Sequence, residues 1–268
     1  MPHLVEGHHA AETALAHSPG NVPALTFRAY ARFLVHRDAT ASDMYYQKAR
    51  QAGADFSAWA FSRAVTLDHP LGHIDAATAY LEEANRLDPL AHSVTWLLVW
   101  NHHMAGRDAD AARVAEQFGR LDVSAPDGIA ACAIASGDVP EALRARQSLA
   151  AIAQAVPEFA PVCHMYEFAI DDAVGDREHA KKLLDQLLAQ TAAEHPVSAV
   201  TIAEGYKALG EFDRAIEWWS RAVDQHAPYT LTWMASVYRA HPIIGKNPRF
   251  LALLKRMGLE SDTMAGAP

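Results

Sequence analysis

The stretch that decides the fold is residues 202–228, IAEGYKALGEFDRAIEWWSRAVDQHAP. Its pattern predicts two short helices joined at Gly210, with the second helix ended at Pro228, whose ring cannot continue the helical hydrogen bonds. Small and large apolar residues recur at helical spacing, on the first helix as Ile202, Ala203 and Tyr206 and on the second as Ala215, Trp219 and Ala222. The small residues let the two helices approach closely, while the aromatic residues fill the space around them.

The same pattern recurs along the chain as a glycine followed five residues later by an alanine. The five pairs are Gly72/Ala77, Gly106/Ala111, Gly137/Ala142, Gly175/Ala180 and Gly210/Ala215. By residue number, the intervals between successive glycines are 34, 31, 38 and 35. Such a near-constant period is typical of a solenoid, in which each helix pair buries its apolar face against its neighbours.

Residues 202–228 resemble a tetratricopeptide repeat of the bacterial type. This helix–turn–helix unit of about 34 residues has a large residue, a small one, Tyr, Gly, Ala, an aromatic, Ala and Pro at fixed offsets. The stretch matches most of these positions, with Pro228 one place late. The resemblance implies an all-α, right-handed superhelical solenoid of about six to seven repeats. We therefore expect a single solenoid over residues 1–258 and a flexible tail over residues 259–268.

The two ends of the predicted array depart from the regular pattern. Residues 1–19 read as a second helix without its first, either a divergent cap or part of a longer parent chain. Residues 229–258 are expected to form a C-terminal repeat and cap. Their string NPRFLALLKRMGL resembles the closing motif of tetratricopeptide arrays behind bacterial winged-helix regulators and class III adenylate cyclases. We expect a capping helix there that buries Phe250, Leu251 and Leu254.

The remaining helices follow from apolar periodicity around the glycine anchors. In the first full repeat, Arg37–Asp38 replaces the usual hinge glycine. The segment DHPLGH, residues 68–73, reads as a turn, so His69 and His73 are expected to be solvated and not a metal pair. The predicted helices are 23–36, 42–51, 56–67, 74–87, 91–104, 108–120, 126–136, 139–155, 158–173, 177–193, 196–208 and 212–225.

Composition narrows the classes of partner. The formal net charge is −9 and the cations are scattered, so nucleic acid is not an expected partner, because phosphate binding needs clustered cations. The chain has no apolar run of 18 residues and no signal-peptide pattern, which favours a cytoplasmic protein without a membrane partner. Cys132 and Cys163 form no metal or redox motif, and we expect buried thiols unless their helices present them to each other.

Motifs for catalysis are missing from the sequence. It contains no nucleophile elbow, no phosphate-binding glycine-rich loop and no HExxH zinc motif. The 15 histidines are spread over the whole chain and suggest no ligand set. We therefore expect no enzyme activity, no cofactor and no metal.

A binding surface is the better-founded hypothesis. In a tetratricopeptide solenoid the first helices of the repeats line a concave groove. Trp96, Trp100 and His103 share one face of their predicted helix. Tryptophan is favoured at binding interfaces, but an aromatic stripe at helical spacing is also typical of core packing, and both interpretations are open. By resemblance, the candidate groove residues are Trp59, Trp96, Trp100, His103, Lys207 and Tyr238.

The sequence therefore favours a non-catalytic scaffold that binds an apolar or aromatic segment of a partner protein, and homo-oligomers are also compatible with it. Only Lys207 among the candidate groove residues is cationic, which disfavours the carboxylate clamp of chaperone-binding tetratricopeptide domains. The closing motif implies an alternative, the sensing arm of a larger transcription regulator or cyclase whose output domain precedes residue 1. A metal-dependent enzyme is the least favoured hypothesis.

Overall fold

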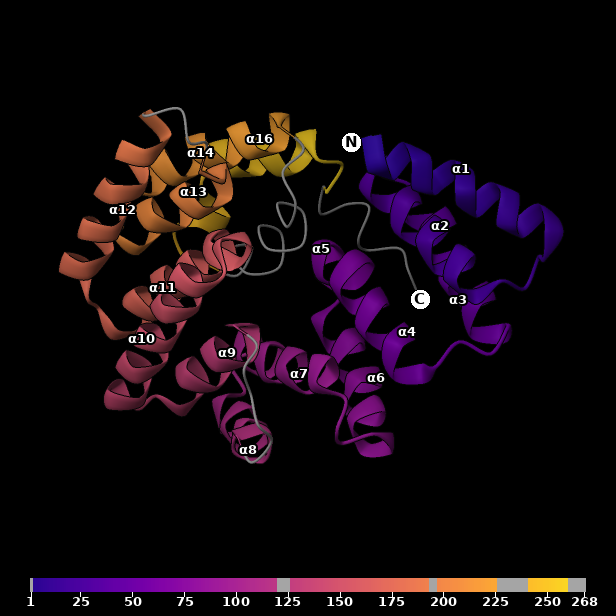
Figure 1. The fold of residues 1–268 in the computed structure, drawn as a ribbon, viewed down its shortest axis with the longest axis horizontal. Helices are drawn as coiled ribbons and strands as arrows, with labels where there is room; N and C mark the ends of the chain where they lie inside the picture. Colours follow the sequence, from indigo (N-terminus) through magenta and orange to yellow (C-terminus); the bar gives the residue numbers. More distant parts are fainter. Residues whose placement is uncertain (1, 120–125, 193–196, 226–240, 260–268) are drawn as a thin grey trace. The chain divides into compact units, whose positions relative to one another are not determined.

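The computed structural model describes residues 2–119, 126–192, 197–225 and 241–259, and within these ranges all regular structure is helical. The predicted all-α class is thereby confirmed for the described part of the chain. Contacts divide the chain into two compact units, which are described in turn. Figure 1 labels the helices named below. Unit 1 comprises Met1–Ala105 with Leu231–Pro268, and unit 2 comprises Gly106–Thr230.

Unit 1 is built mainly from antiparallel helix pairs. In each pair the first helix packs on the second: α2 packs on α3, and α4 packs on α6. Its elements are α1 (Pro2–His17), α2 (Val22–Leu34), α3 (Ala39–Gln51), α4 (Phe56–Arg63), the π-helix η1 (Ala64–Asp68), α5 (His69–Leu71), α6 (Ile74–Leu87), α7 (His92–Met104), the 3₁₀-helix η3 (Ile244–Lys246) and α16 (Pro248–Arg256).

Unit 2 continues the same alternation. In it, α9 packs on α10, α11 on α12, and α13 on α14. Its elements are α8 (Asp108–Gly119), α9 (Pro126–Ser136), α10 (Val139–Ala155), the 3₁₀-helix η2 (Pro157–Phe159), α11 (Ala160–Val174), α12 (Arg177–Ala192), α13 (Ala199–Ala208) and α14 (Phe212–Asp224).

Helix boundaries agree closely with the sequence-based predictions. The predicted ranges 74–87, 126–136 and 139–155 match α6, α9 and α10 to the residue. Apolar periodicity located α6 and α10 correctly, because each buries one face, whereas α9 is buried or partly buried along most of its length.

The turns within the helix pairs share one backbone conformation. All five anchor glycines have a positive φ, between 65° and 78°. Arg37 stands in the turn between α2 and α3 with φ 56°, and it is the only non-glycine residue in the described ranges with a positive φ. Its Nη1 donates to the carbonyl oxygen of Leu34 at 2.7 Å, which satisfies an open carbonyl at the end of α2. Arginine thus occupies the hinge position that glycine fills elsewhere.

Within each unit, first helices also contact one another. In unit 1, α4 contacts both its partner α6 and the next first helix, α7. In unit 2, α9 contacts α11, and α11 contacts α13. Each first helix is consequently packed on more than one side.

The stretch that predicted the fold forms part of the core of unit 2. Ile202, Ala203, Ala215, Trp219 and Ala222 are all fully buried, as the spacing predicted. Ile202 also belongs to an apolar cluster that includes buried residues of α11 and α12.

The segment after α4 differs from the prediction. Residues 68–73 do not form a solvated turn: η1 and α5 extend the helix to Leu71, and Asp68 and His69 are buried. In η1 the amide of His69 bonds back five residues to the carbonyl of Ala64. A π-turn holds more residues than an α-turn, so the side chains that follow it change face. The prediction of a solvated His69 was therefore wrong.

A helix forms where the C-terminal cap was predicted, as α16. Phe250 and Leu254 are buried as expected, but Leu251 is 49% exposed and the prediction for it was wrong. Leu253 occupies the inner face in its place, because the buried positions follow a spacing of three and four residues. Residues 226–240 and 260–268, which hold most of the predicted tail and part of the C-terminal repeat, lie outside the described residues.

Candidate functional site

Trp96 and Trp100 of α7 differ in burial. Trp100 is buried, as the core interpretation expects, and its ring lies edge-on to that of His103 with centroids 6.1 Å apart. Trp96 is only partly buried and lies edge-on to Phe61 of α4 at 5.9 Å. Phe61 and His103 are also partly exposed. The accessible aromatic surface around Trp96 on these first helices therefore includes Phe61 and His103.

Trp59 belongs to the interior of unit 1. Its Nε1 donates to the carbonyl oxygen of Tyr46 at 2.9 Å, so the polar atom of the indole is satisfied within the chain. Its ring stacks on Phe56 at 5.7 Å and meets Tyr80 edge-on at 5.4 Å. These contacts place Trp59 beneath the helix surface rather than on it.

Asp68 is the centre of a buried polar network in unit 1. The hydroxyl of Tyr80 donates to its Oδ2 at 2.5 Å, and Arg63 Nε donates to the same oxygen at 3.0 Å. His73 Nδ1 lies 3.5 Å from the other carboxylate oxygen. Arg63 also pairs with Asp43 of α3, so the network joins three helical segments.

Protonation states in this network fit a structural role. Burial raises the pKa of Tyr80 above its ordinary range, and the neighbouring Asp68 raises it further. Although burial acts in the opposite direction, Asp68 and Asp43 hold the pKa of Arg63 above its ordinary value. Tyr80 therefore stays a hydrogen-bond donor and Arg63 stays charged, which suits a closed network and not proton transfer.

His69 and Asn101 form a second buried group. Asn101 Nδ2 donates to Thr78 Oγ1 at 3.3 Å, whereas its Oδ1 and the Nε2 of His69 have no hydrogen-bond partner. Burial lowers the pKa of His69 to about 4, against the opposing effects of Asp68 and Asn101. His69 is thus neutral at physiological pH.

The remaining candidate groove residues do not join this surface. Lys207 of unit 2 is buried, with its Nζ 3.0 Å from Asp172 Oδ2 and 3.8 Å from Glu204 Oε2, so its charge is taken up within that unit. Tyr238 lies outside the described residues. Of the six predicted positions, Trp59 lies on α4 and the other three described in unit 1, Trp96, Trp100 and His103, lie on α7, and these two helices contact each other.

Unit 2 has a polar network that the sequence did not reveal. Asp171 of α11 is buried, pairs with Arg146 of α10, and lies 2.7 Å from Nδ1 of His179 on α12. Arg146 Nη1 also donates to Asp176 at 2.8 Å, a bond that is the main cause of the lowered pKa of Asp176. The network fastens three consecutive helices. Its only signal in the sequence is a pair of aspartates at the end of an apolar helix.

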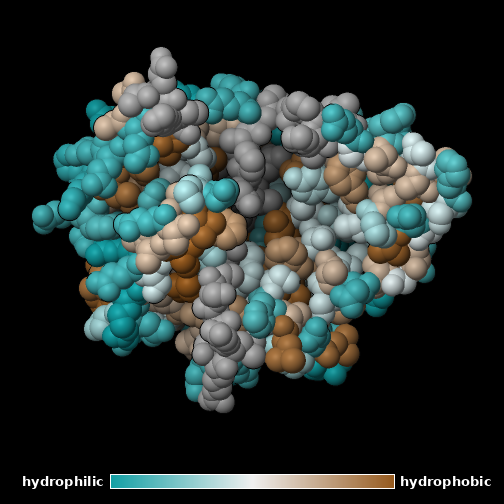
Figure 2. Space-filling view, in the orientation of Figure 1, coloured by the Kyte–Doolittle hydropathy of each residue, from teal (hydrophilic) through white to brown (hydrophobic). Residues whose placement is uncertain are grey.

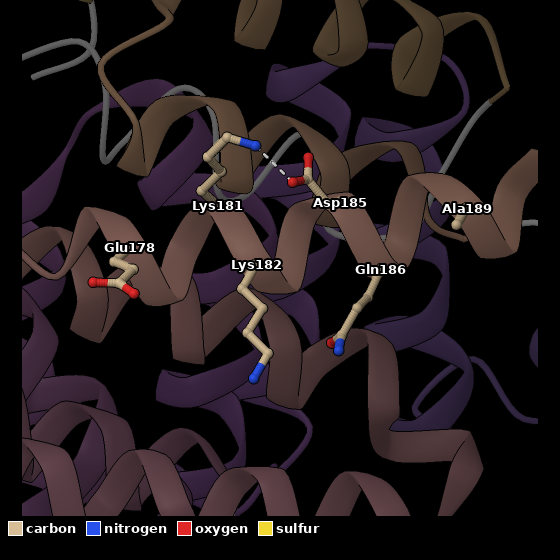
Figure 3. A pocket seen from close by; sticks show the side chains of 6 residues that line it. All are labelled: Glu178, Lys181, Lys182, Asp185, Gln186 and Ala189. Atoms are coloured by element: carbon tan, nitrogen blue, oxygen red, sulfur yellow. Dashed lines mark hydrogen bonds and ion pairs between the residues drawn. The ribbon is translucent and has the colours of Figure 1, made fainter.

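The exposed side of α12 is polar and of mixed charge. Figure 3 shows six residues along this side, with Lys181 turned toward Asp185, and their Nζ and Oδ2 atoms are 2.6 Å apart. Hydrophilic residues gather over α12 in the space-filling view (Figure 2). A shallow pocket lies on this side, lined by Glu178, Lys181, Lys182, Asp185, Gln186 and Ala189. Because acidic and basic side chains alternate around this pocket, it has no net charge that would favour a cationic or an anionic ligand.

The two cysteines are free thiols. Cys163 is buried as predicted, and Cys132 is partly buried. Burial raises the pKa of Cys132 to about 12, with a smaller contribution from Glu141, so its thiolate is scarce at neutral pH. Both thiols are therefore poorly placed to act as nucleophiles, Cys163 because it is buried and Cys132 because its pKa is raised.

Comparisons with known proteins give no family: no family model and no curated protein matches the chain. Within the described ranges, no three His, Cys, Asp or Glu side chains are grouped so as to hold a metal ion. No helix in that part of the chain is long and apolar enough to cross a membrane.

Proposed function

We propose that the protein is a non-catalytic scaffold that binds an apolar or aromatic segment of a partner protein. We further propose that its helix pairs continue as a right-handed tetratricopeptide-like superhelix. Two features support this arrangement: the positive-φ residue in the turn of each pair, and the contacts between successive first helices. A stack of such pairs aligns its first helices along one side.

The observation that carries the proposed binding site is the partly exposed contact between Trp96 and Phe61. The two rings come from consecutive first helices, α7 and α4, with centroids 5.9 Å apart. A partner side chain that covers them removes apolar surface from water, and tryptophan is prominent among residues that dominate binding energy.

The residues beneath this surface favour a rigid binding site. Trp59 and Trp100 are buried, and Trp59 is held by its hydrogen bond to Tyr46. The Asp68 network ties the end of α4 to α6 through Tyr80 and to α3 through Arg63. A surface held in place before binding loses less conformational entropy when the partner arrives.

The distribution of polar groups supports a binding role over catalysis. Asp68 is occupied by Tyr80 and Arg63, and Asp171 by Arg146 and His179. Each of these carboxylates is buried and accepts its hydrogen bonds from side chains of its own unit. Such groups stabilise the helices and are not presented to a substrate.

The proposal is tested by selecting random peptides on the purified protein and measuring their affinity by fluorescence polarisation. We expect a consensus with aromatic or large aliphatic anchors, and binding at least about tenfold weaker for Trp96→Ala, the loss of one well-packed anchor. Trp218→Ala is the matched control, because Trp218 is also partly buried but lies on the second helix α14, beneath Arg221. Failure to select any consensus, or equal weakening by both variants, would refute the proposed site.

A further inference from the structure

Cationic side chains gather where α1, α2 and α3 meet. Arg28 and Arg32 lie one turn apart on α2, and His36 stands in the turn that follows this helix. Lys48 comes from α3 and His8 from α1. The rings of His8 and His36 are 6.0 Å apart, which places the ends of this group close together.

Arg28 is held firmly in this group. Its Nη1 donates to Glu12 Oε1 at 2.6 Å and lies 3.1 Å from His8 Nε2, while its Nη2 donates to the hydroxyl of Tyr45 at 3.4 Å. Its side chain is only 11% exposed. The guanidinium carbon of Arg28 and the Nζ of Lys48 each lie 5.4 Å from the centre of the Tyr45 ring. Two cations thus share one aromatic ring.

Arg32 is the cation that the chain leaves unsatisfied. It is partly exposed, its side chain makes no hydrogen bond or ion pair to a described residue, and its Nε is buried without an acceptor, as is the Nε of Arg28. A charged donor removed from water without an acceptor is costly, and such groups in folded proteins commonly meet a water or an ion. The dipole of α2 favours a cation in its last turn, but it supplies no acceptor for this nitrogen.

The local charge is positive although the chain as a whole carries −9. Of the three cations Arg28, Arg32 and Lys48, Arg28 is the one that pairs with a carboxylate in the described structure, that of Glu12. Of the acids on neighbouring turns, Asp43 pairs with Arg63, and Asp38 accepts the amide of Ala41 at the start of α3. The excess of two positive charges matches a phosphate group, which carries about −1.5 to −2 at neutral pH.

We propose that this group of residues on α1, α2 and α3 is a phosphate-binding site, with Arg32 as its principal open donor. A guanidinium offers paired N–H donors that match the oxygens of a phosphate, and Arg28 is already oriented by Glu12 and Tyr45. The ligand is inorganic phosphate or a phosphate monoester on a protein side chain, since both present the same oxygens. The site is independent of the aromatic surface on α4 and α7.

Calorimetric titration of the full chain tests the site with two probes, inorganic phosphate and a short phosphoserine peptide, at constant ionic strength set with chloride. We expect saturable binding that weakens at least about tenfold in Arg32→Gln, because charge-assisted hydrogen bonds of this kind are lost. The matched control is Arg86→Gln, which removes the same charge from unit 1 at a side chain that is 67% exposed and paired with Glu83. Binding to this control should equal that of the wild type.

Arg32→Lys provides a second variant should Arg32→Gln fail to fold. It keeps the charge but loses the planar fork, so we expect binding to weaken several-fold. Tighter binding of the phosphopeptide would identify a phosphorylated partner, and equal binding of both probes would identify free phosphate. The proposal is overturned if neither probe binds saturably, or if Arg86→Gln weakens binding as much as Arg32→Gln does.

Discussion

Gly205 of α13 lies so close to Phe168 of α11 that a Cβ atom at position 205 would stand 2.8 Å from Cζ of the ring. The same atom would lie 2.9 Å from Cδ1 of Leu184 on α12. Both neighbours are buried core residues. We therefore expect Gly205→Ala to lower the free energy of unfolding by about 1–3 kcal/mol, the usual cost of an overpacked core.

Urea titration followed by circular dichroism measures this effect. Gly20→Ala is the control, because the nearest side-chain atom to a Cβ there is Ala52 Cβ at an ordinary 3.9 Å, and the backbone has no positive φ at that residue. We expect the control to change stability by less than about 1 kcal/mol. A Gly205→Ala variant as stable as the wild type would show that α11 and α13 separate easily.

Asp68 and Asp43 both pair with Arg63, but their surroundings differ. The side chain of Asp68 is 3% exposed and that of Asp43 is 46% exposed. Removing Asp68 leaves Tyr80 and Arg63 without a buried acceptor, so we expect Asp68→Ala to cost about 3–5 kcal/mol. Asp43→Ala should cost about 1 kcal/mol or less, since solvent screens an exposed pair. Equal losses in denaturant titrations of the two variants would contradict a central role for Asp68.

The helices were predictable because their signals are local. Apolar residues at helical spacing and a hinge five residues before an alanine were enough to place α6, α9 and α10. Arg37 adopts the same positive φ as the hinge glycines, although no glycine is present at this turn. The π-turn in η1 could not be predicted from the sequence. It shifts the following side chains to another face of the helix, and this shift depends on how the segment packs and not on its composition.

The candidate sites were less predictable, because they depend on which helices meet. The aromatic residues of α7 were recognised, but their pattern is the same for core and surface, and only burial separates Trp100 from Trp96. The cations around Arg32 come from three helices and look scattered in the sequence. The Asp68 network was missed for the same reason, since its partners lie 5 and 12 residues away in the chain.

His69 makes stability depend on pH. Burial lowers its pKa to about 4 in the folded chain, against 6.5 for an ordinary histidine. Between these values the unfolded chain binds a proton that the folded chain does not, so stability is complete above pH 6.5 and falls as the pH drops toward 4. The loss from this residue amounts to about 3 kcal/mol.

The pH dependence is checked by urea titrations between pH 7 and pH 4. His69→Gln should show a shallower decline than the wild type, because glutamine does not titrate. His17→Gln, at an exposed histidine of α1, should keep the wild-type slope. Parallel curves for wild type and His69→Gln would mean that His69 takes up its proton without strain in the folded chain.

The two tryptophans of α7 should respond differently to truncation. Trp100 is buried, so Trp100→Ala removes core packing and we expect it to cost about 3–5 kcal/mol in stability. Trp96 is partly exposed and packs on Phe61 at one edge, so Trp96→Ala should cost about 1–2 kcal/mol while it weakens peptide binding. Melting curves and peptide affinities measured on both single variants separate the two effects. If Trp100→Ala melts like the wild type, or if Trp96→Ala unfolds the chain, the assignment of core and surface on α7 is reversed.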